Sequence, residues 1–438
     1  MRVPLCAAVL ALAGCESSPS RPKAAALDPA PVATVDASVA VVPDPKPLKV
    51  TPPAADAVVA LARGSNTFGF ELYAKLRGKP GNLVVSPSSI TTALTMTWGG
   101  ARGETAKQMQ KVLHLDGAPA QVMTVAGTLA RSLEDPSRPV VFRIANQLFG
   151  EKSYTFEEVF VEQTETAFGA PMEMLDFRTA PGPAREKINA WVESRTEKRI
   201  VDLLPPDGID SETRLVLVNA IYFLGEWAEP FESTRTQPAP FFVAKATQKQ
   251  VPAMNATEQF RYAHANGLAA LELPYKGGSM SMLIVVPDAV DGLPALERSF
   301  DAGKLDALVS SLKPERVWLQ LPKFEIAPAQ SLSLGDQLVA LGMPLAFDRK
   351  RADFTGIANP TNPEDRLVIA KVFHKAFIKV DEKGTEAAAA TAVSMARAGG
   401  APAKPTELKA DRPFLYFIRD TASGLVLFMG RVSDPSVK

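Results

Sequence analysis

The sequence predicts one large α+β domain over residues 56–438, and three observations support this prediction. The chain has 438 residues, 46% of them hydrophobic, which is enough material for a large buried core. After Asp56, apolar residues recur at helical spacing in some segments and alternate as in β-strands in others. No internal repeat and no proline-rich linker divides this region, so we expect one mixed domain rather than several.

The N-terminus is predicted to be a lipoprotein signal peptide covering residues 1–15. It reads MRVPLCAAVLALAGC, with one arginine and an apolar run too short to span a bilayer. Its last four residues, Leu-Ala-Gly-Cys, resemble a bacterial lipobox, in which Cys15 is lipidated. The alternative is an ordinary secretory signal that happens to contain Cys15. We expect an exported protein, lipid-anchored at the bacterial cell envelope or surface, or extracellular, with membrane contact through the lipid alone.

Residues 16–55 are predicted to form a disordered tether. The segment is rich in proline and alanine and has no aromatic residue, and repeated prolines favour extended, semi-stiff chains. Both cysteines of the chain lie in the first fifteen residues. The folded domain must therefore be held together by packing, without disulfides.

The elements of the domain follow from local patterns. A helix is expected from Asp56, then a short strand after Gly81, then a helix that the serines of SPSS can cap. Further strands are predicted at Arg214–Phe223, Met280–Pro287, Arg316–Ile326 and Leu367–Asp381. The C-terminus is predicted to form two strands, PFLYFIRD and GLVLFMGRV, joined by a short turn.

Two predicted strands each carry a polar residue on an apolar face. Alternation places Asn219 with Leu215, Leu217, Ile221 and Phe223, and His374 with Val372, Ala376, Ile378 and Val380. Burying either group unpaired costs on the order of 1 to 3 kcal/mol, so we expect the two to meet across the sheet. The alternative is a core histidine that finds its partner elsewhere.

Composition and motifs exclude several function classes. Lys plus Arg and Asp plus Glu number 48 each, so no net charge favours nucleic acid. The chain has three histidines, and we find no nucleophile elbow, zinc motif or phosphate loop. We therefore expect no enzyme, no metal and no cofactor, and a surface hydrolase is disfavoured for want of a nucleophile motif.

Residues 384–400 read GTEAAAATAVSMARAGG and are unusually small and bland. Taken alone, four consecutive alanines favour a short exposed helix. Other blocks change this interpretation. They read, in order, NLVVSPSSITTALTMTWGGARGETAKQMQKVLHL, LVNAIYFLGEWAEPF, LPKFEI, VFHKAFIKVDEKGTEAAAATA and RPFLYFIRDTASGLVLFMGRVSDP.

These blocks resemble the signature blocks of the serpins, and with the lipobox the chain resembles a bacterial lipoprotein serpin. The resemblance implies about nine helices around a large central mixed β-sheet, two smaller sheets and an exposed reactive loop. It also implies a monomeric, suicide-type inhibitor of serine proteases. A protease cleaves the loop and forms an acyl-enzyme, and the loop then inserts into the central sheet and traps the protease covalently.

Under this interpretation, the alanine-rich segment is the loop's hinge, comprising Gly384, Thr385, Glu386, Ala387, Ala388, Ala389, Ala390 and Thr391. Small side chains suit a segment that is first exposed and then becomes a buried strand. Alternation predicts that after insertion Thr385, Ala387, Ala389 and Thr391 face the core. Glu386, Ala388 and Ala390 would face outward, so we expect Glu386 to keep its charge near water.

The resemblance assigns further residues. It implies a shutter beneath the sheet, comprising Ser86, Ser89, Asn219 and His374, and a breach where insertion begins, comprising Trp227, Lys323 and Glu382. Counting sixteen residues from Glu382 places the reactive bond at Ala398–Gly399, with Arg397–Ala398 as the alternative because the loop is long. The alternative function is a non-inhibitory serpin-fold module that binds at a surface. Such relatives usually carry bulky, charged or proline residues in the hinge.

Overall fold

The computed structural model describes residues 53–135, 137–386 and 404–438, apart from the side chains of residues 144–146 and 219. All of these residues belong to the compact unit Pro47–Lys438. Within them the chain forms nine α-helices, in agreement with the number of about nine that the resemblance implies. None of the helices in these ranges is long and apolar enough to cross a membrane. The helices are α1 (Ala55–Leu76), α2 (Pro87–Gly99), α3 (Gly103–Val112), α4 (Pro119–Leu133), α5 (Glu158–Phe168), α6 (Pro181–Arg195), α7 (Leu293–Ser299), α8 (Ala302–Ser311) and α9 (Gly335–Leu341).

The strands form three sheets, and the predicted α+β class with one mixed central sheet is confirmed. The central sheet has six strands in the order β10-β13-β14-β4-β2-β3. Its β2–β3 pair is parallel and its other pairs are antiparallel. The bounds are β10 (Phe324–Ile326), β13 (Ile378–Val380), β14 (Gly384–Thr385), β4 (Leu215–Glu226), β2 (Val140–Glu151) and β3 (Met172–Leu175).

A second sheet carries the C-terminal hairpin and the long ribbon in the middle of the chain. Its main order is β1-β17-β16-β8-β7-β6-β9-β15, with β5 paired to β6. The bounds are β1 (Leu83–Val85), β17 (Val426–Val432), β16 (Phe414–Asp420), β8 (Met280–Pro287), β7 (Leu268–Pro274), β6 (Thr247–Ala265), β9 (Lys313–Pro322), β15 (Thr406–Lys409) and β5 (Gln237–Ala244). A third sheet pairs β11 (Leu332–Ser333) with β12 (Phe373–His374).

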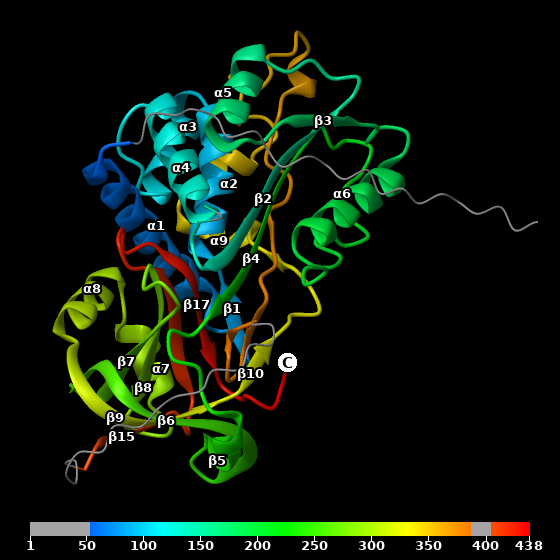
Figure 1. Cartoon of the computed structure of the whole chain (residues 1–438). Helices are drawn as coiled ribbons and strands as arrows, with labels where there is room; N and C mark the ends of the chain where they lie inside the picture. The colour runs from blue at the N-terminus through cyan, green and yellow to red at the C-terminus, as the bar shows by residue number, and fades with distance from the viewer. Residues whose placement is uncertain (1–52, 136, 387–403) are drawn as a thin grey trace, which may run out of the picture. The chain divides into compact units, whose positions relative to one another are not determined.

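Strand β4 shows how the sequence builds the central sheet. Val218 and Ala220 belong to the apolar cluster that includes Ile188 of α6, whereas Ile221 and Phe223 belong to the main core cluster. Both faces of β4 are therefore covered, which is why this strand is apolar almost throughout. Figure 1 shows α6 beside β2 and β4 on one side, with α1, α2 and α4 on the other.

Two strand predictions differ from the structure. The segment Arg316–Ile326 forms two strands, β9 and β10, which belong to different sheets. The segment Leu367–Asp381 is not one strand, because β12 pairs with β11 and only β13 joins the central sheet. In both cases the apolar alternation is continuous but the hydrogen-bonding partner changes along the segment, and local patterns carry no signal of that change.

Candidate functional site where a strand enters the central sheet

The central feature of the site is β14, which lies between β13 and β4. Val380 of β13 pairs with Thr385, and Gly384 and Thr385 pair with Glu226 and Gly225 of β4. A tight turn precedes β14, in which the Asp381 N–H donates to the Gly384 carbonyl at 3.0 Å. The first two residues of the predicted hinge are therefore already part of the central sheet in the uncut chain.

Gly384 is required here by a close approach between backbones. A Cβ at this position would lie well inside van der Waals contact of the Gly225 carbonyl oxygen on β4. The glycine therefore lets β14 approach β4 closely.

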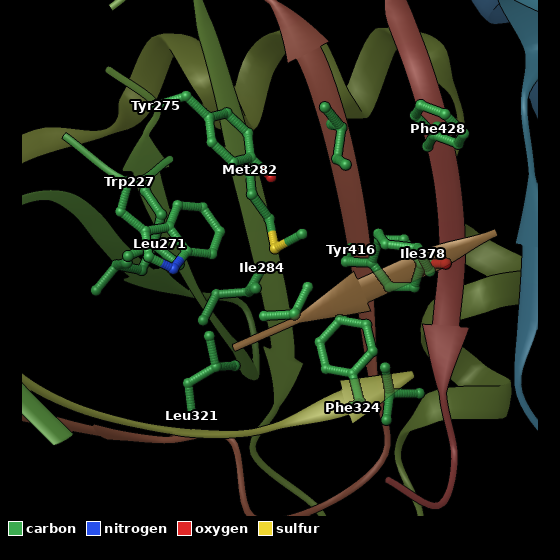
Figure 2. Packing of buried hydrophobic residues seen from close by; sticks show 14 of the residues in the cluster. Trp227, Leu271, Tyr275, Met282, Ile284, Leu321, Phe324, Ile378, Tyr416 and Phe428 are labelled. Carbon is green, nitrogen blue, oxygen red and sulfur yellow. The ribbon is translucent and has the colours of Figure 1, made fainter. Parts of the chain in front are cut away.

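Thr385 already faces the core in the uncut chain, on the side that alternation predicts for the inserted strand. It is 2% exposed, and its hydroxyl lies 2.6 Å from the hydroxyl of Tyr275. The Tyr275 ring is stacked on Trp227, with ring centroids 4.6 Å apart and an interplanar angle of 12°. Figure 2 shows these two rings side by side in the core.

In the uncut chain Glu386 is buried, whereas its exposure in the inserted strand stays a prediction. Its carboxylate is 7% exposed and forms an ion pair with Arg199. Burial raises the pKa of Glu386, and the positive charge of Arg199 opposes this rise. Glu386 also has a φ of 55°, a left-handed conformation that is unusual for a residue with a Cβ.

The segment that follows α6 explains why Glu386 is buried. Besides Arg199, it contains the Val201 carbonyl, which accepts a hydrogen bond from Lys375 Nζ at 2.9 Å. Lys375 Nζ also donates to the Ala329 carbonyl at 3.2 Å, and burial lowers the pKa of this lysine. Arg199 thus lies against Glu386 just after β14, and the same connection contacts the chain before β13 through Lys375; side-chain alternation alone does not reveal this.

The three predicted breach residues come together around the turn before β14. Lys323 Nζ donates to Glu382 Oε2 at 2.7 Å, and the Thr236 hydroxyl donates to Glu382 Oε1 at 2.8 Å. Burial alone would raise the pKa of Glu382, but these hydrogen bonds outweigh it and hold the pKa below its usual value. Trp227 Nε1 donates to the Asp381 carbonyl at 3.0 Å, so the indole also fixes this turn.

Two of the predicted shutter residues, Ser86 and Ser89, lie at the start of α2, and His374 of β12 contacts Ser86. The Ser86 side chain accepts from the Ser89 N–H at 3.3 Å and caps the helix, as expected from the SPSS turn. The Ser86 N–H donates to His374 Nε2 at 3.1 Å, so His374 carries its ring proton on Nδ1. Burial lowers the pKa of His374 to about 4, so the ring is neutral at pH 7. The Asn219 side chain lies outside the described residues, and its pairing with His374 stays a prediction.

Comparisons with known proteins agree with this arrangement. The sequence pattern of the family described as serpin (serine protease inhibitor) matches residues 63–435. The chain belongs to the serpin family. It is 37% identical to the leukocyte elastase inhibitor of Equus caballus over 388 residues, which cover 86% of this chain and 99% of that protein.

Solved serpin structures resemble this serpin closely in both loop states. Uncleaved ovalbumin aligns with a TM-score of 0.77 and 30% identity, covering 86% of this chain and all of that one. A loop-inserted, cleaved ovalbumin mutant aligns with a TM-score of 0.75 and 29% identity over the same shares. These matches place the chain in a family of protease inhibitors rather than enzymes.

Several residues of the site were not predicted from the sequence. Tyr275 follows β7, Gly225 lies within β4 and Thr236 directly precedes β5, and none of them carries a motif of its own. Arg199 lies in a helix-to-strand connection where charged residues are common. One available signal was the pair of glycines, Gly225 and Gly384, since an isolated glycine in a strand often marks a close backbone approach.

Some predicted site residues lie outside the described residues. These are Ala387 to Thr391 of the hinge, both candidate reactive bonds at Arg397, Ala398 and Gly399, and the lipidation residue Cys15. Within residues 53–135, 137–386 and 404–438, no group of three or more His, Cys, Asp or Glu residues is arranged to hold a metal ion.

Proposed function

We propose that this serpin inhibits serine proteases by loop cleavage followed by insertion of the cleaved loop into the central sheet. The single observation that carries this proposal is β14. In the uncut chain Gly384 pairs with β4, and Thr385 pairs with both β4 and β13. Insertion therefore extends a strand that has already begun, and the entropic cost of starting a new ladder is largely met beforehand.

The chemistry belongs to the protease. Its serine hydroxyl attacks the carbonyl carbon of the reactive bond, the C-terminal part of the loop leaves as an amine, and an ester joins the loop to the serine. Water would normally hydrolyse this ester. Movement of the loop into the sheet carries the ester and the protease away, which disturbs the protease's hydrolytic geometry before water attacks.

The composition of the hinge supports inhibition over the alternative of a non-inhibitory surface binding module. Beyond Glu386, the predicted strand continues with four alanines and a threonine, all of which fit a buried central position. We place the reactive bond at Ala398–Gly399, which suits proteases with small, elastase-like pockets. A bond at Arg397–Ala398 would suit trypsin-like enzymes, whose pocket carboxylate pairs with the guanidinium.

The test is incubation of the purified protein with elastase-like, trypsin-like and chymotrypsin-like proteases, followed by denaturing gels. The expected result is a covalent complex that survives boiling in detergent, together with a cut form whose melting temperature is much higher than that of the uncut form. Mass spectrometry of the released peptide identifies the bond, because the peptide begins at Gly399 or at Ala398. Cleavage by every protease without a complex, and without a gain in melting temperature, would favour the binding-module alternative.

We also propose that the protein is exported and anchored through a lipid on Cys15, acting as a monomer held by the tether of residues 16–55. The lipobox sequence and the proline-rich composition of the tether support this. In a bacterial host, wild-type protein should incorporate labelled fatty acid and sediment with membranes, whereas Cys15→Ser should do neither. An unlabelled wild-type protein in the soluble fraction would contradict the anchor.

A further inference from the structure

The Tyr275 side chain is fixed in place on all sides. It is 0% exposed and follows β7 directly, with its backbone bridged to Trp227. Its ring stacks on Trp227 and meets the edge of Phe223 at a centroid distance of 4.9 Å. A Cβ at Gly225 would lie only 2.8 Å from the Tyr275 ring, so the glycine provides the space in which the ring sits. The hydroxyl therefore points at a fixed place in the sheet.

This hydroxyl needs a partner because its surroundings are apolar. Trp227, Tyr275 and Phe223 all belong to the main core cluster. Burial raises the pKa of Tyr275 far above its usual value, so the phenol stays protonated. Its partner is the hydroxyl of Thr385 at 2.6 Å, and both groups are buried. A loop residue without a hydroxyl at this level would leave the phenol unpaired.

One position along the loop satisfies both constraints of the site. The level of Gly384 tolerates no Cβ, and the next level requires a hydroxyl that can pair with Tyr275. Between Glu382 and Pro413, a glycine precedes a hydroxyl-bearing residue once, at Gly384–Thr385. The pair of constraints therefore matches a single alignment of the loop with β4.

Every small displacement of the loop is penalised. A slip of one residue brings either Thr385 or Lys383 to the level that tolerates only glycine, and it also turns each side chain to the opposite face. A slip of two residues keeps the faces but brings Ala387 or Lys383 to Tyr275. Alanine offers no hydroxyl, and lysine would place a charge in the apolar core.

We infer that Tyr275 is the positioning residue that sets the register in which the loop enters the central sheet, by pairing with the hydroxyl of Thr385. This inference rests on the proposed function, since a register matters most when the remaining loop follows as a strand. An alanine-rich strand specifies its own register poorly, because neighbouring positions are alike in size and polarity. The Tyr275–Thr385 pair therefore fixes a register that the alanines alone would leave undefined.

Four variants isolate this role. Tyr275→Phe keeps the ring stack and removes the phenol hydroxyl, and Thr385→Val removes the other hydroxyl at nearly constant volume. Thr385→Ser keeps a hydroxyl and serves as the rescue. Tyr416→Phe is the matched control, because Tyr416 lies in the same core and its hydroxyl donates to the Leu83 carbonyl at 3.3 Å. Figure 2 shows Tyr416 set apart from the Trp227–Tyr275 stack.

The first measurement uses the uncut protein. The Glu386 N–H donates to the Lys379 carbonyl at 3.0 Å, so its hydrogen exchange reports whether the register is kept. We expect exchange at least tenfold faster in Tyr275→Phe and in Thr385→Val, and wild-type exchange in Thr385→Ser and Tyr416→Phe.

The double variant Tyr275→Phe with Thr385→Val separates register from stability. Each single variant leaves one buried hydroxyl unpaired, whereas the double variant leaves none, so its melting temperature should return toward wild type. If the pair sets register, Glu386 exchange stays fast in the double variant. The inference is overturned if exchange recovers together with the melting temperature, or if Tyr275→Phe exchanges like wild type.

A second measurement follows the cut protein. Crystal structures should show Thr385 level with Gly225 and Val380 in the wild type, and shifted or mixed registers in the double variant. A wild-type register in the cut double variant would also overturn the inference. If the cut wild type inserts no strand, the proposed function fails, whereas exchange in the uncut protein still decides the role of Tyr275.

Discussion

Acid should destabilise this serpin through His374, and the effect can be isolated with one substitution. The imidazole is 2% exposed and accepts a hydrogen bond from the Ser86 N–H at 3.1 Å. Protonating Nε2 removes this acceptor and places a charge in a buried site. His374→Gln keeps an acceptor that can receive the Ser86 N–H, but it cannot be protonated in this range.

The size of the effect follows from the pKa difference. Burial lowers the pKa of His374 from 6.5 to about 4. The unfolded imidazole therefore binds a proton more tightly than the folded one, and falling pH favours unfolding. The contribution of neutral His374 to the free energy of unfolding is fully present above pH 6.5. It declines as the pH falls toward 4, by about 3 kcal/mol in total. At pH 5 the loss is about 2 kcal/mol.

The assay compares unfolding rates at constant denaturant at pH 7.5 and pH 5, because the native state of a serpin is expected to be kinetically held. If His374 is hydrated in the transition state, lowering the pH from 7.5 to 5 should accelerate the unfolding of the wild type about 30-fold more than that of His374→Gln. Carboxylates common to both proteins contribute equally and cancel in the comparison. Equal pH dependence in the two proteins would refute the assignment of acid sensitivity to His374.

Three further predictions concern the hinge and the breach. Gly384→Ala places a Cβ against the Gly225 carbonyl and should destabilise β14 by about 1 to 3 kcal/mol, seen as faster exchange of the neighbouring amides. Ala389→Arg should convert the inhibitor into a substrate, because the inserted strand would bury an unpaired charge, whereas the outward-facing Ala388→Arg should have a much smaller effect. The measurement is the number of inhibitor molecules cleaved for each protease molecule trapped. Glu382→Gln removes a partly exposed ion pair but keeps an acceptor for Thr236, so the free energy of unfolding should fall by about 1 kcal/mol in a denaturant titration. A change near zero would show that the ion pair does not stabilise the turn.

The sequence predicted the fold class and the inward faces of the central strands well. Alternation placed Ile221 and Phe223 on the core side of β4, and both lie in the main core cluster. The strand Met280–Pro287 has the predicted bounds. Such segments have one uninterrupted set of partners, so their local pattern and their tertiary contacts agree.

Failures occur where a contact depends on distant parts of the chain. The burial of Glu386 requires Arg199, which arrives from a connection almost two hundred residues earlier in the sequence. Tyr275 matters because the Trp227 ring packs on it and because Gly225 leaves space for its ring. Neither arrangement leaves a periodic trace in the sequence. The hinge segment can therefore be predicted from the sequence more readily than the contacts that surround it.

The register of β14 also connects the breach to the shutter. Thr385 is level with Gly225 on β4 and with Val380 on β13. Counting six residues forward along an inserted loop leads to Thr391, and counting six residues back leads to Asn219 along β4 and to His374 in the chain that precedes β13. A strand extended in this register brings its second hydroxyl between the two polar groups that alternation places on the inner face. Ala387 and Ala389, the inward positions in between, are apolar, like Phe223 and Ile221 opposite them. A register set at Tyr275 would thus place the Thr391 hydroxyl beside Asn219 and His374. The inserted strand would then offer these two polar side chains a hydrogen-bonding partner.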